Sequence, residues 1–172
     1  MNYLFWAAVI LALFHFLYEW AIAPAIRLKL KYRLFALRDQ LRRAKLEMGS
    51  CFPDRHFCSL QDSLNVVIAL VDKFDIGLIA RARKLSADDP EFRRRCESRC
   101  QIVDDCRLEV AKSIRDQTTK LAMELLLVNC GAWVIYLLPI AVVVGGYSEL
   151  KRCIPSLASI SEPDLAKVTD LY

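Results

Sequence analysis

Two long apolar stretches of this chain contain polar side chains that could act inside a membrane. His15 and Glu19 lie in the first stretch, Asn129 lies near the start of the second, and Glu124 directly precedes the second. An acidic side chain at the centre of a membrane helix costs about 2.5–3.5 kcal/mol when it faces lipid. We therefore expect these four residues to line a pore or to form polar contacts between helices.

The polar residues of the first stretch share one helix face with small residues. This face consists of Ala8, Ala12, His15 and Glu19, which are spaced four, three and four residues apart. Small residues let membrane helices approach closely, and polar groups can bond across such a contact. Several copies could surround an aqueous path lined by His15 and Glu19, and a ring of carboxylates favours cations. Alternatively, Glu19 bonds to Asn129 or Tyr18 and His15 joins two helices.

Cysteine and histidine residues form a second candidate group for chemistry. The group consists of Cys51, His56, Cys58, Cys96, Cys100 and Cys106. Zinc requires four nitrogen or sulfur ligands, often supplied as two short pairs. The chain contains no CxxC motif, and free cysteine is commonly a small buried residue. We therefore expect core cysteines, no metal site and no cofactor.

Basic residues follow the first apolar stretch directly. The first four are Arg27, Lys29, Lys31 and Arg33. Lysine and arginine just inside a membrane span attract anionic lipid headgroups by about 1 kcal/mol each, so we expect these residues to lie at the membrane surface. Nucleic acid is a weaker alternative, because the chain has no RNA-reading signature or aromatic stacking platform.

Enzyme motifs are absent from the sequence. There is no GxSxG, Walker loop, HExxH or GxGxxG, and the chain contains only 2 histidines. The sequence therefore does not predict an enzyme.

The apolar stretches are long enough to cross a bilayer. Tyr3–Ile26 contains Glu19 as its only full charge, and Leu125–Ser148 contains none. Each has 24 residues, which as a helix would extend roughly 36 Å and so exceed the roughly 30 Å hydrocarbon core. No lysine or arginine precedes the first stretch, unlike in a cleaved signal peptide. We interpret both stretches as membrane spans.

Charge predicts the orientation of these spans. Residues 27–120 contain 21 basic and 14 acidic side chains, and positive residues remain in the cytoplasm. We therefore expect a protein of the plasma (bacterial inner) membrane with its N-terminus outside and its central part in the cytosol. The predicted parts are a first transmembrane helix (1–26), a cytosolic helical domain (27–120), a second transmembrane helix (121–147) and a short non-cytosolic tail (148–172).

Apolar periodicity predicts how the helices continue between the spans. One helix is expected over residues 3–48, bent near Pro24, whose ring removes a hydrogen bond. A second begins near Ser59 and continues through Ile79. A third begins after an Asp89 cap with Pro90 in the first turn, and with no Pro or Gly before Gly131 it runs unbroken into the second span. The tail contains a short amphipathic helix capped by Ser161.

The sequence thus predicts an all-α membrane protein with two transmembrane helices extended into a three-helix cytosolic domain. Polar groups in both spans lack an obvious partner, so we expect self-assembly. The function most favoured is an oligomeric ion channel or membrane-permeabilising pore with a cytosolic sensing domain. The alternative is a membrane-anchored scaffold or accessory subunit that holds a cytosolic or membrane partner, through the surface of residues 60–110, without transport.

Overall fold

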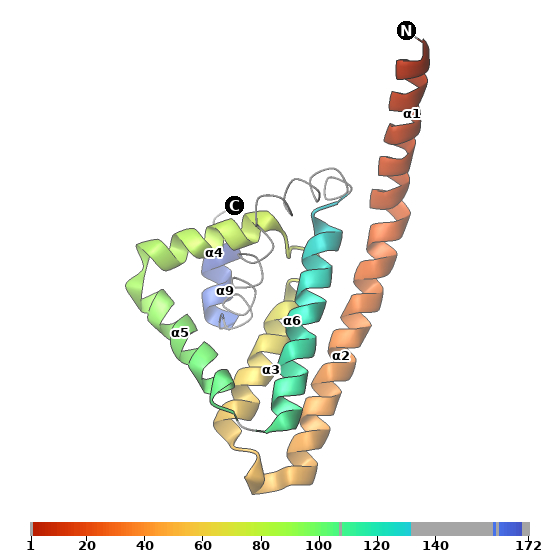
Figure 1. The fold of residues 1–172 in the computed structure, drawn as a ribbon. Coiled ribbons are helices and arrows are strands. Elements are labelled where there is room, and N and C mark those ends of the chain that lie inside the picture. The colour runs from red at the N-terminus through yellow and green to blue at the C-terminus, as the bar shows by residue number, and fades with distance from the viewer. Residues whose placement is uncertain (1, 107, 132–159, 161, 170–172) are drawn as a thin grey trace.

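The computed structural model of the chain describes residues 2–106, 108–131, 160 and 162–169. Every regular element in these residues is a helix, so the predicted all-α class is confirmed. A long N-terminal helix lies at one edge of the molecule, and the other helices lie beside its C-terminal half (Figure 1).

The N-terminal helix runs almost continuously over the range that the sequence predicts. It comprises α1 (Asn2–Leu17), a π-helical turn η1 (Tyr18–Ile22) and α2 (Ala23–Met48). The amide of Ala23 donates to the carbonyl of Tyr18, five residues back. Pro24 has no amide hydrogen to donate, and the widened turn just before it accommodates that loss. The irregularity predicted near Pro24 is therefore a π-helical turn.

The described residues contain one candidate membrane span rather than the two predicted. The helical run Tyr3–Cys51 includes a window of mean hydropathy 1.7, of which only 6% is buried. Residues 121–129 of the expected second span belong instead to α6 (Glu109–Asn129), where Leu121, Ala122 and Leu125 are buried. The rest of that span, residues 132–147, lies outside the described residues.

The second predicted helix is two helices. The chain forms α3 (Asp54–Ala69), turns, and then forms α4 (Ile76–Asp88). The predicted start near Ser59 is wrong, because α3 begins directly after Pro53, whose fixed φ suits a helix start. The side chain of Asp75 accepts a hydrogen bond of 2.7 Å from the amide of Leu78 and caps α4. Gly77 is consequently in the first turn of a new helix.

The Asp75 cap gives a first testable prediction. Replacing Asp75 by Ala leaves the Leu78 amide without its acceptor, which we expect to destabilise α4 by about 1 kcal/mol. Amide hydrogen exchange of the first turn of α4 measures this loss. The control is Asp72→Ala in the same turn, an exposed position that should change stability by less than about 0.5 kcal/mol. Equal exchange in both variants would contradict the capping role.

The third predicted helix begins as expected but is broken. Asp89 caps α5 (Pro90–Asp104), accepting from the amides of Glu91 at 2.9 Å and Phe92 at 3.0 Å. The helix ends at Asp104, and α6 starts at Glu109, so the single unbroken helix is wrong. The prediction rested on the absence of proline and glycine between Glu91 and Gly131. A helix can also end without either residue, because tertiary packing overrides local helix propensity.

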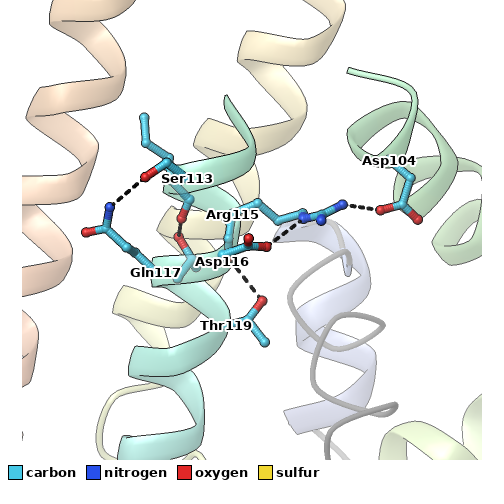
Figure 2. A network of polar contacts seen from close by, with 8 residues as sticks. Asp104, Ser113, Arg115, Asp116, Gln117 and Thr119 are labelled. Atoms are coloured by element: carbon cyan, nitrogen blue, oxygen red, sulfur yellow. Dashed lines mark hydrogen bonds and ion pairs between the residues drawn. The ribbon is translucent and has the colours of Figure 1, made fainter. Parts of the chain in front are cut away.

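A polar network lies where α5 ends and α6 begins (Figure 2). Arg115 of α6 bonds to Asp104 at the end of α5 and to Asp116 at 3.3 Å. Gln117 donates to Ser113 at 3.0 Å on the neighbouring turn. Arg115 therefore joins α5 and α6.

We call α2–α6 together with α9 (Glu162–Thr169) the helical domain. Its core forms where α2 packs against α3 and α6. The inner face of α2 consists of Leu30, Leu34, Leu37, Leu41 and Ala44, all buried. The largest side chains opposite it are also fully buried: Phe52, Leu64, Phe74, Phe92, Leu125 and Leu126. The domain has more helices than the three predicted.

The C-terminal helix α9 is part of this core. It packs against α3 and α4, and Ile160 and Val168 are buried. Asp164 is also buried and accepts two hydrogen bonds from Arg95 of α5, at 2.9 and 3.2 Å. Ile160 and residues 162–169 therefore pack within the helical domain. Ser161, the expected cap of this helix, lies outside the described residues.

Candidate functional site

The four polar residues predicted for the membrane interior lie on two elements that meet. His15 is at the end of α1 and Glu19 is in η1, whereas Glu124 and Asn129 are on α6. Helix α6 packs along α2, and its last residue reaches the level where η1 passes into α2. We call the contacts there the anchor junction, formed by Tyr18, Glu19, Arg27, Asn129 and Gly131.

Asn129 is the centre of the anchor junction. Its amide nitrogen donates to the carbonyls of Val71 at 2.8 Å and Phe74 at 3.2 Å, and its amide oxygen accepts from Nε of Arg27 at 2.7 Å. One side chain thus joins α2, α6 and the turn between α3 and α4. One alternative from the sequence paired Glu19 with Asn129, but the amide oxygen of Asn129 accepts from Arg27 instead.

Glu124 also bonds within the chain. One of its carboxylate oxygens lies 3.0 Å from Nη1 of Arg33 on α2, and the side chains of Arg33 and Glu124 are 50% and 35% exposed. An ion pair this exposed contributes at most about 1 kcal/mol. Glu124 and Asn129 therefore both form polar contacts between α2 and α6.

Glu19 lies against the end of α6. Gly131 has φ +69°, and a Cβ atom added there would lie 2.5 Å from Oε1 of Glu19. The neighbouring Tyr18 hydroxyl donates to the carbonyl of Val128 at 3.4 Å. The sequence alone did not single out Gly131 for this contact, although a glycine after the last apolar turn of a helix is the usual signal of such an end.

Gly131 supplies a second testable prediction. Gly131→Ala should destabilise the protein by about 1–2 kcal/mol, because the left-handed conformation is unfavourable for a residue with a Cβ atom. Thermal unfolding of the detergent-solubilised protein, followed by circular dichroism, measures the loss. Adding Glu19→Ala should recover only the part caused by the close contact, since the φ angle is unchanged. A Gly131→Ala protein as stable as the original would contradict the conformation.

The small-residue face of α1 is open along most of its length. Ala8, Ala12 and Glu19 are exposed and His15 is half-buried. The surrounding apolar side chains are exposed on every side of α1: Tyr3, Leu4, Phe5, Trp6, Ile10, Leu11, Leu13, Phe14, Phe16 and Leu17. A helix that is apolar all round is typical of a membrane span.

The predicted cysteine and histidine group is not gathered into one site. Cys51 and Cys58 are exposed, whereas Cys96 and Cys106 are buried. Burial raises the pKa of Cys96 to about 11, so its thiol stays protonated at neutral pH and is a poor metal ligand. In the part of the chain that the structure describes, no three Cys, His, Asp or Glu side chains are grouped so that they could hold a metal ion.

The four basic residues predicted to lie at the membrane surface divide into two pairs. Arg27 and Arg33 bond to α6 through Asn129 and Glu124. Lys29 is exposed and Lys31 is half-buried. The two arginines therefore stabilise the α2–α6 contact.

Comparisons with known proteins do not place this chain in a family. No protein-family model matches it, and no curated protein or solved structure matches it significantly. The function is therefore inferred from the geometry of the molecule alone.

Two features of functional interest lie outside the residues that the sequence singled out. The first is the ion pair of Arg95 with the buried Asp164, which binds α9 into the domain. The second is an exposed apolar stripe on α2 that includes Leu28 and Tyr32. Its residues recur at heptad spacing, so the sequence could have predicted this stripe. The stronger apolar stripe on the inner face of the same helix was assigned instead.

Proposed function

We propose that this chain is a membrane-anchored scaffold. Residues 2–22 cross the membrane as its anchor, and the helical domain holds a partner protein at the membrane surface without transport. The anchor has 21 residues, which as a helix corresponds to roughly 30 Å, the thickness of the hydrocarbon core.

The observation that supports this proposal most is the contrast between the anchor and the domain. The apolar residues of α1 are exposed all round, whereas the buried core residues begin at Ala23 and belong to the domain. An apolar helix that adds nothing to a core must bury its surface elsewhere, and a lipid bilayer provides that environment.

The polar contacts at the anchor junction also favour a scaffold over a pore. Asn129 and Glu124 are used within one copy of the chain, so they do not require other copies as partners. Arg27 is held by Asn129 directly below the anchor, which fixes how the anchor joins the domain.

We propose the same orientation as the charge pattern predicts. The N-terminus lies outside, and the helical domain, including α9, lies in the cytosol of a cell bounded by a plasma (bacterial inner) membrane. Lys29 and Lys31 would lie within reach of anionic lipid headgroups, which attract such residues by about 1 kcal/mol each.

The mass of the detergent-solubilised particle tests the scaffold directly. We expect a single copy of the 19.7 kDa chain per micelle, and no ion flux from liposomes that contain the purified protein. A closed ring of many copies that conducts ions would contradict the scaffold.

An oligomeric pore is the second candidate, and one observation favours it. The face formed by Ala8, Ala12, His15 and Glu19 lies within the anchor, and its alanines and carboxylate are exposed. Copies that meet through this face would place carboxylates around one path. A pore predicts ion flux in liposomes that Glu19→Ala removes, together with a multimeric particle.

A further inference from the structure

The face of α2 that points away from the helical domain has an apolar stripe of its own. We call it the outer face; it consists of Leu28, Tyr32, Phe35, Asp39, Arg42 and Leu46, spaced alternately four and three residues apart. At about 100° per residue it lies opposite the buried inner face. Leu28, Tyr32 and Leu46 are 54%, 64% and 84% exposed.

Lipid cannot cover the outer face if α1 crosses the membrane. Helices α1 and α2 form one rod that extends beyond the rest of the molecule (Figure 1). Phe35 lies 13 residues past Ile22, where the anchor ends, which is roughly 20 Å along the helix axis. If the helix is tilted by 40° from the membrane normal, Phe35 is still about 15 Å from the hydrocarbon core. The headgroup zone is only about 5–8 Å thick. From Tyr32 onward the outer face therefore lies in water, where an apolar stripe marks a protein contact.

The charges around this stripe are mostly positive. The basic residues beside or within it are Lys29, Lys31, Arg38, Arg42 and Arg43, and the acidic residues are Asp39 and Glu47. Arg38 lies over the ring of Phe35 with its guanidinium carbon 5.0 Å from the ring centroid, and Phe35 contacts Tyr32 edge to face at 6.5 Å. Aromatic and arginine side chains are the residues that most often dominate protein interfaces.

A second copy of the chain is a poor partner for this face. Anchoring in the same membrane would orient two α2 helices in parallel. At heptad spacing, Arg42 would then meet Arg42 of the other copy, and Arg38 would lie near the other copy's Arg43. Like charges in such a contact repel, so the occupant must be apolar along one stripe and acidic beside it.

We propose that the outer face of α2 binds an amphipathic helix of another protein, whose apolar stripe is flanked by aspartate and glutamate. The face extends over 19 residues, or about 27 Å from Leu28 to Leu46, so the bound helix is about five turns long. This inference rests on the proposed scaffold function and names the chemistry of its partner.

Fluorescence anisotropy with designed peptides tests the proposal on the full chain in lipid nanodiscs. The probe is a labelled helix of about 21 residues with leucine at heptad a and d positions and glutamate at e and g. One control peptide has lysine in place of glutamate, and the other has serine in place of leucine. We expect the acidic amphipathic peptide to bind at least tenfold more tightly than either control.

Variants of the chain show where the peptide binds. Tyr32→Ala and Phe35→Ala should each weaken binding at least tenfold, and both should keep the helix content of the original protein. The matched control is Ile76→Ala on α4, which is 55% exposed and should leave binding unchanged.

Three results would overturn the inference: equal affinity for the lysine peptide, no effect of Tyr32→Ala and Phe35→Ala, or a second copy on this face. Cross-linking through Tyr32→Cys, in a chain with Cys51→Ser and Cys58→Ser, detects a second copy. The first two results leave membrane insertion and particle mass unchanged, so they show failure of this inference alone. A second copy on this face would give a dimeric particle that conducts no ions, whereas failure of the scaffold gives a conducting ring of many copies.

Discussion

Lysine in place of both Leu11 and Phe14 is expected to abolish membrane insertion of the N-terminal helix. Both side chains are exposed, at 50% and 67%, and both lie near the middle of residues 2–22. Each lysine at the centre of a span costs about 2.5–3.5 kcal/mol, so the pair changes the insertion equilibrium by more than about a thousandfold. Fusing residues 1–26 to a soluble reporter and extracting membranes with alkaline carbonate measures the effect.

The matched control for this experiment replaces the same two residues by alanine. Alanine keeps the helix uncharged, so the control fusion should remain in the membrane pellet with the original fusion. A lysine-substituted fusion that resists carbonate as well as the control would show that α1 does not cross the bilayer.

Leu34→Ala is expected to destabilise the helical domain by about 2–5 kcal/mol. Leu34 is 0% exposed, and its removal leaves a cavity where α2 faces the rest of the core. For a chain of this size the loss corresponds to a decrease of roughly 4–20 °C in the midpoint of thermal unfolding. Circular dichroism of the detergent-solubilised protein measures it.

Leu28→Ala is the control for Leu34→Ala, because it removes the same atoms from the outer face of the same helix. Leu28 is 54% exposed, so its replacement should change stability by less than about 0.5 kcal/mol. Similar losses from both substitutions would show that α2 packs against the domain through another face.

The first helix was predictable from the sequence, and the helix breaks were not. Strong periodicity along one unbroken apolar stripe defines residues 3–48, and a Pro near the membrane end signals the irregular turn. Within residues 59–79 the apolar residues continue across the break, so periodicity alone did not reveal the turn before Asp75. The break before Glu109 contains no glycine or proline, and tertiary packing decides its position.

The sequence identified the polar residues of the candidate site but not the residues to which they bond. Polar residues in apolar surroundings require partners, and this argument found Glu124 and Asn129. Their partners Arg33 and Arg27 were assigned to lipid, because the expected second span began at residue 121 and so left the end of α6 out of the domain. The same assumption placed Asp164 on the other side of the membrane from Arg95, with which it forms two hydrogen bonds.

The scaffold proposal requires a single anchor followed by a domain whose first and last helices lie on the same side of the membrane. Labelling of sealed, right-side-out vesicles with a membrane-impermeant maleimide and an external protease tests it. The protein for this test has Cys153→Ser, an epitope before Met1 and a second epitope after Tyr172, and its exposed Cys51 and Cys58 report on the domain.

We predict that the protease removes only the N-terminal epitope from intact vesicles. Cys51, Cys58 and the C-terminal epitope should become accessible together, and only after detergent is added. A C-terminal epitope that is cleaved from intact vesicles while Cys51 and Cys58 remain unlabelled would contradict the account.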